Sequence, residues 1–343
     1  MKCLKKKCYS WKECIALREL ESLKSIASHD NIVGIKELIR EESSLLFFVF
    51  EYMPDGNLYD IMRKCALDRS RGIPNNNLSR SSISSIVSQV LKGLDHIHSH
   101  GFVHRDLKPE NLLLNGGSVK IADFGLARQP KSCPNEPALT AYISTRWYRS
   151  PEILLRHPDY GAPVDIFALG CVMAEMISLK PLFPGTNEID QIHQITNILG
   201  APCLNVWPEG LLLIDKLKIA SLFPNGAFQG ATDLSATFQT TRTNLQRAIP
   251  EASPDALTIL QKMLYLDPQI RPSASLILKD PVFLSMTSMP TESVEYTKNL
   301  DGNKEPSRYY PCSSVDYFVK TEEFQSPHQN PYNGSSRQVI ELQ

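Results

Sequence analysis

The sequence lacks any long apolar run. No stretch approaches the ~18 to 20 consecutive apolar residues that a membrane-spanning helix needs. The lysine-rich start continues as Tyr-Ser-Trp-Lys-Glu-Cys and not as the apolar core of a signal peptide. We therefore expect a protein without membrane association that resides in the cytoplasm, the nucleus or both.

An excess of charge of either sign is also missing. The 36 Lys and Arg residues against 37 Asp and Glu residues give a net charge of -1, which provides no broad basic surface for a nucleic-acid backbone. Five lysines do fall within the first twelve residues. They form either a solvated corner between a strand and a helix or a small nuclear-import or nucleic-acid patch. We favour the corner and expect no nucleic-acid partner.

Closely paired cysteines are absent as well. The eight cysteines are scattered, and no two are arranged as Cys-x-x-Cys. This pattern predicts reduced thiols and not a disulfide framework.

Histidines, by contrast, are concentrated in one segment. Four of the eight occur between residues 96 and 104, and His96 and His100 are four residues apart on an expected helix. Such a pair could supply half of a zinc site. A structural role near the end of the helix is the simpler interpretation, and we favour it.

The hydrophobic pattern predicts a small lobe that combines a sheet and a helix. Residues 11–26 carry apolar side chains at helical spacing, and residues 31–39 and 44–53 are short runs rich in Val, Ile and Phe. With 343 residues, the chain exceeds the size at which one hydrophobic core stops growing. A second lobe should therefore follow.

That second lobe is predicted to be mainly helical. Residues 81–101 place Ile83, Ile86, Val90, Leu94 and Ile97 on one helical face, and residues 164–178 are apolar almost all round. From residue 286 to residue 343 the composition turns to Ser, Thr, Asn, Pro and charge, which predicts a disordered tail. The expected fold class is α+β, with no internal repeat.

The segment from residue 104 to residue 152 contains an ordered set of motifs. His-Arg-Asp-Leu-Lys-Pro-Glu-Asn occupies residues 104–111, Asp-Phe-Gly begins at residue 123, and Ser-Pro-Glu ends at Glu152. With this order and spacing, the chain resembles eukaryotic serine/threonine protein kinases over roughly residues 1–285. The resemblance implies a bilobal fold, with residues 1–57 as a partial, truncated N-terminal β-sheet lobe and residues 58–285 as a mainly helical C-terminal lobe.

The chemistry of phosphoryl transfer explains these residue types. A carboxylate beside the acceptor hydroxyl can orient it and take its proton, which is the role that the motif gives to Asp106. Asn111 and Asp123 supply hard oxygen ligands suited to Mg²⁺. Lys108 brings a positive charge to the γ-phosphate of ATP, and the resemblance implies that Thr145 hydrogen-bonds Asp106 and Lys108. The alternative, that these carboxylates are surface ion-pair partners, explains neither their order nor their spacing.

The resemblance also implies an adenine site and a hydrophobic spine. In the spine, His104 packs under Phe124, with Leu23 and Ile35 above. The residues expected to bind the nucleotide are a lysine and its helix partner, a gatekeeper, two hinge residues and the floor of the pocket: Lys2, Glu19, Phe50, Glu51, Met53 and Leu113.

A narrower resemblance concerns the branch of the family. Residues 144–152, residues 181–202 and an insert from about 203 to 250 are similar to the group of cyclin-dependent and mitogen-activated kinases. Its branch of male-germ-cell-associated, intestinal-cell and meiotic kinases is most similar at residues 5–23, 47–53, 57–62 and 140–149. This implies protein substrates with Ser-Pro or Thr-Pro sites, a monomeric state and roles in meiosis or the cell cycle.

Control by phosphorylation is a further expectation. Thr140 and Tyr142 form a Thr-x-Tyr arrangement in the expected activation segment, with Arg105, Arg146 and Arg149 nearby in the sequence. We expect an upstream kinase to phosphorylate the pair, Arg146 and Arg149 to hold the phosphate on Tyr142, and Arg105 to hold that on Thr140. The plain alternative is a loop that happens to carry two hydroxyl groups.

The residues before Lys2 are the point of departure from this family. In related kinases about thirty residues, with two strands and a glycine-rich turn over the phosphates, precede this lysine, and the sequence contains no substitute for them. Three interpretations stay open: an incomplete version of an active kinase, a truncated isoform or pseudokinase that acts as a scaffold with little catalysis, and a pure interaction module. The presence of Asp106, Asn111 and Asp123 favours descent from an active enzyme.

Overall fold

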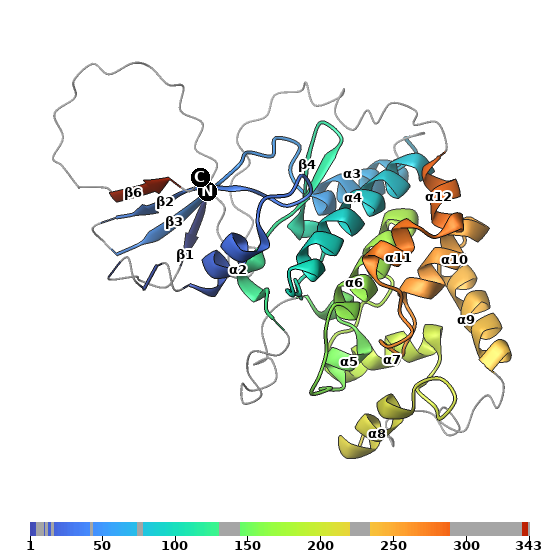
Figure 1. Cartoon of the computed structure of the whole chain (residues 1–343). Coiled ribbons are helices and arrows are strands. Elements are labelled where there is room, and N and C mark those ends of the chain that lie inside the picture. Colours follow the sequence, from blue (N-terminus) through green and yellow to red (C-terminus); the bar gives the residue numbers. More distant parts are fainter. Residues whose placement is uncertain are drawn as a thin grey trace.

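Within its described residues, the computed structural model has a four-stranded sheet and the helix Arg18–Ile26 in the smaller lobe, and helices dominate the larger lobe (Figure 1). The structure describes residues 1–4, 10, 13–14, 17–41, 44–73, 78–129, 145–219, 234–288 and 338–341. This arrangement confirms the predicted bilobal α+β fold.

Three strands of the small lobe pair around a central apolar strand. They are β1 (Lys2–Leu4), β2 (Ile35–Arg40) and β3 (Leu46–Phe50), and both β1 and β2 pair with β3 in antiparallel register. The buried side chains of Leu38, Leu46 and Phe48 pack with those of Leu20 and Cys14 into a separate core of this lobe. The predicted antiparallel strands at residues 31–39 and 44–53 are therefore confirmed, with narrower bounds.

Helix α2 (Arg18–Ile26) packs against this sheet and begins later than the sequence pattern predicted. Leu17 has an extended backbone, with φ -68° and ψ 128°, so no continuous helix runs through it. Glu19 and Glu21 lie in the first turn of α2, where negative charge stabilises a helix N-terminus. Glu19, the predicted partner of Lys2, is thus the second residue of this helix.

A fourth strand, β6 (Gln338–Glu341), pairs antiparallel with the outer edge of β2, which gives the sheet order β1-β3-β2-β6. The prediction of a disordered tail from residue 286 is therefore wrong for residues 338–341, and a helix also continues to Thr287. Composition averaged over a long segment does not detect four residues that pair through their backbone with a strand edge. Residues 289–337 lie outside the described part.

The large lobe is built around two long helices. Helix α4 (Arg80–Ser99) buries the five apolar positions that its spacing predicted, and Ser79 caps its N-terminus by accepting a hydrogen bond from the Ser82 amide. Helix α6 (Pro163–Ser178) is buried on nearly every side, as its uniform apolar pattern predicted. The other helices are α3 (Leu58–Ser70), α5 (Pro151–Leu154), α7 (Glu188–Leu199), α8 (Pro208–Lys216), α9 (Leu234–Ala248), α10 (Pro254–Met263), α11 (Ala274–Leu278) and α12 (Pro281–Thr287).

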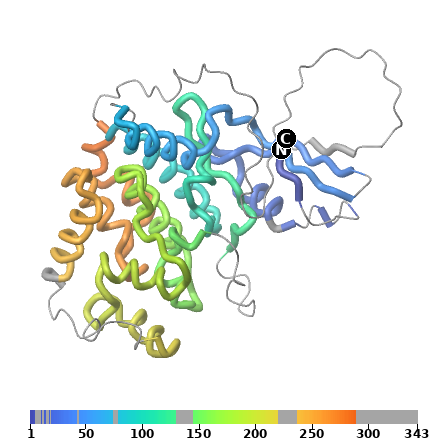
Figure 2. The backbone as a smooth tube through the Cα atoms, turned by 180° about the vertical axis from the view of Figure 1, so that it is seen from behind, coloured from blue at the N-terminus to red at the C-terminus, as the bar shows by residue number. Residues whose placement is uncertain are grey.

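A short hairpin lies where the two lobes meet (Figure 2). It consists of β4 (Leu112–Asn115) and β5 (Ser118–Ile121), and Gly116 and Gly117 form its turn with φ 56° and 88°. Two successive positive φ angles are typical of the tight hairpin turns that glycine favours. The hairpin ends two residues before Asp123, and it thereby positions this residue at the junction.

Two general properties concern the described part of the chain. No helix in it is both long and apolar enough to cross a membrane. Its cysteines, namely Cys3, Cys14, Cys65, Cys171 and Cys203, are free thiols, in agreement with the scattered pattern of the sequence.

Candidate active site

Lys2 joins three elements at the junction of the lobes. Its Nζ atom lies 2.7 Å from Oε1 of Glu19 on α2 and 2.9 Å from Oδ1 of Asp123, which follows β5. Lys2 is 4% exposed and Glu19 7%. The structure thus brings together the lysine, the helix carboxylate and the metal-ligand candidate that the sequence singled out.

The pKa values of this trio follow from burial and from their mutual attraction. Burial alone would lower the pKa of Lys2, but the charges of Asp123 and Glu19 raise it above its ordinary value. Burial alone would raise the pKa of Asp123, but Lys2 holds it below its ordinary value. For Glu19 burial outweighs the attraction of Lys2, so that its pKa is raised. Lys2 is therefore charged at neutral pH, and Asp123 is ionised opposite it.

The loop from His104 to Asn111 brings Asp106, Lys108 and Asn111 into contact. Lys108 Nζ donates to Asp106 Oδ2 at 2.8 Å, and Asn111 Nδ2 donates to the carbonyl oxygen of Asp106 at 2.7 Å and to its Oδ2 at 3.1 Å. Asn111 lies in the short 3-10 helix η1 (Pro109–Asn111), which fixes its side chain toward the loop. These bonds orient the Asp106 carboxylate and keep one of its oxygens next to a positive charge.

The backbone of the same loop is held by a buried carboxylate that the sequence reasoning missed. Asp165 on α6 accepts hydrogen bonds from the amides of His104 and Arg105, each at 2.8 Å, and contacts His98 Nε2 at 2.9 Å. Arg105 has φ 71°, a region that costs energy for any residue but glycine. The fixed carboxylate stabilises this strained turn directly before Asp106. The available signal was a charged residue within an otherwise apolar helix.

A backbone hydrogen bond ties the loop to the segment of Asp123. The Ala122 amide donates to the carbonyl oxygen of Asn111 at 2.9 Å, so the two expected metal ligands are held next to each other by main-chain contacts. Asp123 itself has a left-handed backbone, with φ 63°, and its side chain accepts from the Gly125 amide at 3.3 Å.

Three residues expected to line the adenine site lie in one apolar cluster between the lobes. Phe50, Met53 and Leu113 pack together with Val33 and Ala122, two residues that the sequence reasoning did not name. Val33 follows the loop after α2, and Ala122 precedes Asp123. The sequence reasoning considered these segments only as a strand and as part of a motif, and not as sources of apolar contacts. Such a patch between two lobes suits the apolar face of a purine.

Glu51 contributes more than the backbone groups predicted for a hinge residue. Its carboxylate accepts from the Gly34 amide at 2.6 Å and pairs with Lys120 Nζ at 2.8 and 2.9 Å. Gly34 precedes β2, whereas Lys120 lies on β5. Although burial alone would raise it, the pKa of Glu51 is lowered by Lys120 and by the Gly34 amide. The Glu51 side chain therefore links the residue before β2 in the small lobe to β5.

The predicted contact of His104 with Phe124 is confirmed. The rings meet edge to face with centroids 5.1 Å apart, and Leu23 packs against the same core. Ile35 packs against the separate core of the small lobe, so its predicted place above Phe124 stays a prediction.

His96 contacts the rings of two other histidines near the end of α4. The His96 ring lies 4.7 Å from that of His29 and 4.3 Å from that of His100, and its Nε2 bonds with the carbonyl oxygen of Ile26 at 2.6 Å. Within the described residues, no group of three or more His, Cys, Asp or Glu side chains is arranged to hold a metal ion. His96 thus links α4 to the end of α2.

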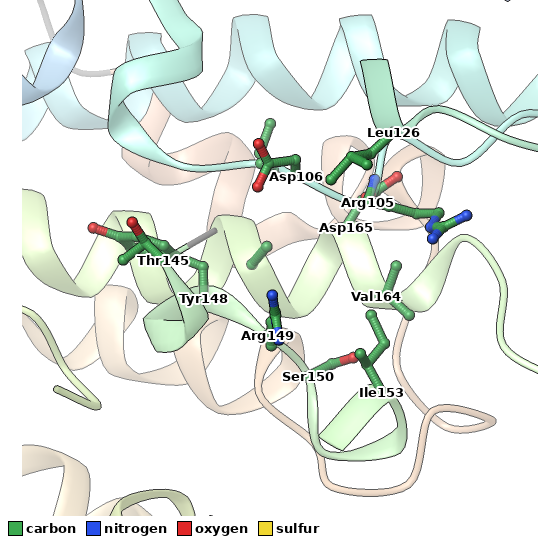
Figure 3. A pocket seen from close by; sticks show the side chains of 12 residues that line it. Arg105, Asp106, Leu126, Thr145, Tyr148, Arg149, Ser150, Ile153, Val164 and Asp165 are labelled. Carbon is green, nitrogen blue, oxygen red and sulfur yellow. The ribbon is translucent and has the colours of Figure 1, made fainter. Parts of the chain in front are cut away.

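Asp106, Thr145 and Arg149 line one cavity in front of α6 (Figure 3). No hydrogen bond of Thr145 with Asp106 or Lys108 is defined in the described part of the chain, and this contact stays a prediction. The cavity has the Asp106 carboxylate on one wall and an arginine on another. These two charged side chains make part of its lining polar.

All three arginines that we expected to bind phosphate contact other groups. Arg146 Nη1 donates to the Thr186 carbonyl at 3.0 Å, and Arg149 Nη1 lies 3.8 Å from Oε1 of Glu188. The pKa of Arg149 is lowered, first by burial and then by the charge of Arg146. The Arg105 guanidinium lies over the Tyr160 ring at 5.6 Å. Thr140 and Tyr142 lie outside the described residues.

The predicted pair of Glu152 and Arg271 is confirmed. Arg271 donates to both carboxylate oxygens of Glu152, at 2.7 and 3.2 Å, and both side chains are at most 1% exposed. This fork fixes α5, and with it the end of the segment that lines the cavity.

The residues at the junction suit a magnesium ion bound together with phosphates. Asp123 is ionised, and Asn111 uses its Nδ2 group on Asp106, which leaves its amide oxygen as a ligand. Mg²⁺ is commonly held by one or two such oxygens, with phosphate and water completing its shell.

Comparison with known proteins agrees with this geometry. Residues 1–283 match the protein kinase domain family. The chain is 46% identical over 284 residues to serine/threonine-protein kinase ICK of Mus musculus and to serine/threonine-protein kinase MAK of Homo sapiens, which covers 82% of this chain and 40% and 41% of those proteins. It is 39% identical over 307 residues to cyclin-dependent kinase F-3 of Oryza sativa subsp. japonica, covering 89% of this chain and 64% of that protein. The chain thus spans about two fifths of the length of the first two relatives.

Proposed function

The chain belongs to the protein kinase family, in the branch of the MAK and ICK serine/threonine kinases, and from this premise we propose that it transfers the γ-phosphoryl group of Mg-ATP to serine and threonine hydroxyl groups of proteins. One observation carries the proposal. Lys2 pairs at once with Glu19 and Asp123, while the Asp106 carboxylate is oriented by Lys108 and Asn111. The residues expected to bind the phosphates and the carboxylate expected to act on the acceptor hydroxyl thus lie near the junction of the two lobes.

The mechanism divides the work between these two groups. Asp106 orients the acceptor hydroxyl and takes its proton as the oxygen attacks phosphorus. Lys108, whose pKa Asp106 raises against the effect of burial, stays charged and attracts the transferred phosphoryl group. Asp123 and Asn111 would hold a magnesium ion, which would neutralise charge on the triphosphate oxygens. Lys2 stays charged for the same polyanion because Glu19 and Asp123 surround it.

The acceptor should be followed by proline. Membership of a branch with cyclin-dependent relatives supports this proposal.

Phosphorylation of Tyr142 should control the site. Burial and then the charge of Arg146 lower the pKa of Arg149, and the Glu188 carboxylate lies 3.8 Å from Arg149. A phosphate with nearly two negative charges would compete successfully with this one carboxylate. The upstream kinase would thereby order the segment between Asp123 and Glu152.

Peptide phosphorylation tests the activity. The chain should phosphorylate a Ser-Pro peptide faster than the same peptide with Ala in place of Pro. Asp106→Asn should lower turnover by about two to four orders of magnitude with little change in the affinity for ATP, because Asp106 acts on the acceptor. Asp159→Asn, at an exposed position, is the matched control. Equal turnover in the Asp106 variant and the parent would contradict the assignment.

A second experiment tests the control. The parent, Thr140→Ala and Tyr142→Phe are compared after treatment with a cell extract that contains kinases, and mass spectrometry locates the phosphates. We expect Tyr142→Phe to stay at the activity of untreated protein. Full activation of both variants would overturn the proposed switch without affecting the proposed reaction.

A further inference from the structure

The small sheet ends in a strand that comes from the far end of the chain. Strand β6 pairs with β2 in antiparallel register, with Arg40 opposite Gln338 and Glu37 opposite Glu341 (Figure 1). No other strand of the described chain covers this edge of β2.

The geometry of β2 determines where this pairing is possible. Its register with β3 shifts between Ile35 and Glu37, so the strand is regular only from Glu37 to Arg40. Strand β6 pairs with this regular part and with nothing before it. An uncovered strand edge presents a row of backbone donors and acceptors that readily pairs with another extended segment.

The sequence of β6 suits this role. Gln-Val-Ile-Glu places two β-branched residues between polar ones, whereas few aliphatic residues occur in the preceding segment from residue 289. β-Branched residues favour strands. A stretch with strand propensity thus occurs at the place where the chain returns to the sheet.

A row of opposed residues connects β6 with Lys2. Ile340 stands opposite Leu38, Leu38 opposite Phe48, and Phe48 opposite Lys2. The row crosses all four strands, and Leu38 and Phe48 in its middle are fully buried. A strand added at one edge therefore supports, through the sheet, the strand that positions Lys2 at the other edge.

From these observations we propose that the regular part of β2, Glu37–Arg40, is a strand-docking site and that residues 338–341 of the same chain are its occupant. Docking adds backbone hydrogen bonds and stiffens the sheet that presents Lys2 to Glu19 and Asp123. The inference concerns the sheet alone and does not depend on the proposed reaction.

The connection within one chain favours its own segment over a second copy. The 49 residues 289–337 separate α12 from β6, and at ~3.3 to 3.6 Å per residue a chain of that length can reach well over 100 Å. A tether that can span the distance holds the segment near its site at an effective concentration of roughly millimolar. A separate copy would have to reach such a concentration in solution.

Cysteine pairs test the register and the occupant together. Glu37→Cys with Glu341→Cys introduces thiols at opposed positions, where Cβ atoms lie about 4.5 to 5.5 Å apart. Glu37→Cys with Gln338→Cys is the matched control, because three residues along a strand displace the thiols by about 10 Å. Both variants and the parent are oxidised mildly at low protein concentration, and mass spectrometry of digested protein identifies the linked peptides apart from native cysteines.

The proposal predicts a disulfide within one chain for the opposed pair, in at least about fivefold higher yield than for the control pair. Equal yields for the two pairs, or no bond in either, would overturn it. A bond found only between two chains would also overturn it, since the occupant would then be a second copy.

Hydrogen exchange provides a second test that needs no cysteine. The double variant Val339→Pro and Ile340→Pro removes backbone donors from β6. The control is the double variant Val339→Ile and Ile340→Val, which keeps strand propensity and composition. In the proline variant, amides of Glu37–Arg40 should exchange about tenfold faster, those of Lys2–Leu4 should also accelerate, and those of α6 should not change. The control should match the parent. Unchanged protection of β2 in the proline variant would refute docking.

Discussion

Replacing Arg271 by alanine should destabilise the protein more than any surface substitution. The guanidinium group donates to both oxygens of Glu152, to the Pro163 carbonyl at 2.7 Å, and to the carbonyls of Tyr265 and Leu266 at 2.8 and 3.3 Å. Arg271→Ala would leave the buried carboxylate of Glu152 without its partner and remove the donor of all these carbonyl oxygens.

The magnitude follows from the burial of the pair. Removing one partner of a buried ion pair costs about 3 to 5 kcal/mol, mainly because the other charge stays buried. For a folded unit of this size, about 1 kcal/mol corresponds to roughly 2 to 4 °C in melting temperature. We therefore expect the melting temperature to fall by roughly 6 to 20 °C.

Thermal unfolding followed by circular dichroism measures this difference, and two variants identify its cause. Glu152→Gln with Arg271→Met removes both charges and should melt above the Arg271→Ala protein, because no buried charge is left alone. Arg271→Lys keeps the charge but not the fork of donors, so it should lie between Ala and Arg. An Arg271→Ala protein that melts within about 1 °C of the parent would refute the reasoning.

Three further predictions concern buried carboxylates. Burial raises the pKa of Glu175 to about 7 from 4.5, and its side chain accepts a hydrogen bond from the Tyr148 hydroxyl at 2.7 Å. The contribution of Glu175 to the free energy of unfolding is therefore complete below pH 4.5, where the group is neutral, and is lost as pH rises through 7. The parent should thus lose about 2 to 3 kcal/mol relative to Glu175→Gln between pH 5 and pH 8, measured by denaturant unfolding, and a constant difference would contradict this. Lys120→Met removes the partner of the half-buried Glu51 and should lower the free energy of unfolding by about 1 kcal/mol at pH 7, with the loss shrinking as acid protonates Glu51; a loss independent of pH would point to packing instead. Asp165→Asn places an amide donor against the backbone amides of the catalytic loop and should cost about 2 to 4 kcal/mol and lower turnover, whereas normal stability and turnover would contradict its role in fixing the loop.

The sequence pattern was sufficient where local spacing determines structure. The periodicity of residues 81–101 predicted the buried face of α4. The order of the motifs predicted that Asp106, Asn111 and Asp123 belong to one site. The contact of Glu152 with Arg271 spans more than a hundred residues and was predicted through family resemblance, since no local pattern connects the two.

Contacts that depend on chain folding were missed. Glu51 pairs with Lys120 on another lobe, and nothing near either residue indicates the other. Asp165 resembled one charged residue at the start of a buried helix, and only the three-dimensional structure shows which amides it holds. Strand β6 pairs with residues about three hundred positions earlier, so composition alone assigned it to a disordered tail.

The dependence of ATP binding on magnesium tests the central claim most directly, namely that Lys2, Asp123 and Asn111 form one site for a metal-bound nucleotide. Titration calorimetry gives the dissociation constant for ATP with Mg²⁺ and with a chelator, for the parent, for Asp123→Asn and for the exposed control Asp159→Asn. We expect Mg²⁺ to tighten binding by about tenfold or more, equivalent to about 1.4 kcal/mol, in the parent and the control and to have little effect in Asp123→Asn. The same magnesium dependence in all three proteins, or no binding of ATP to the parent, would contradict the account.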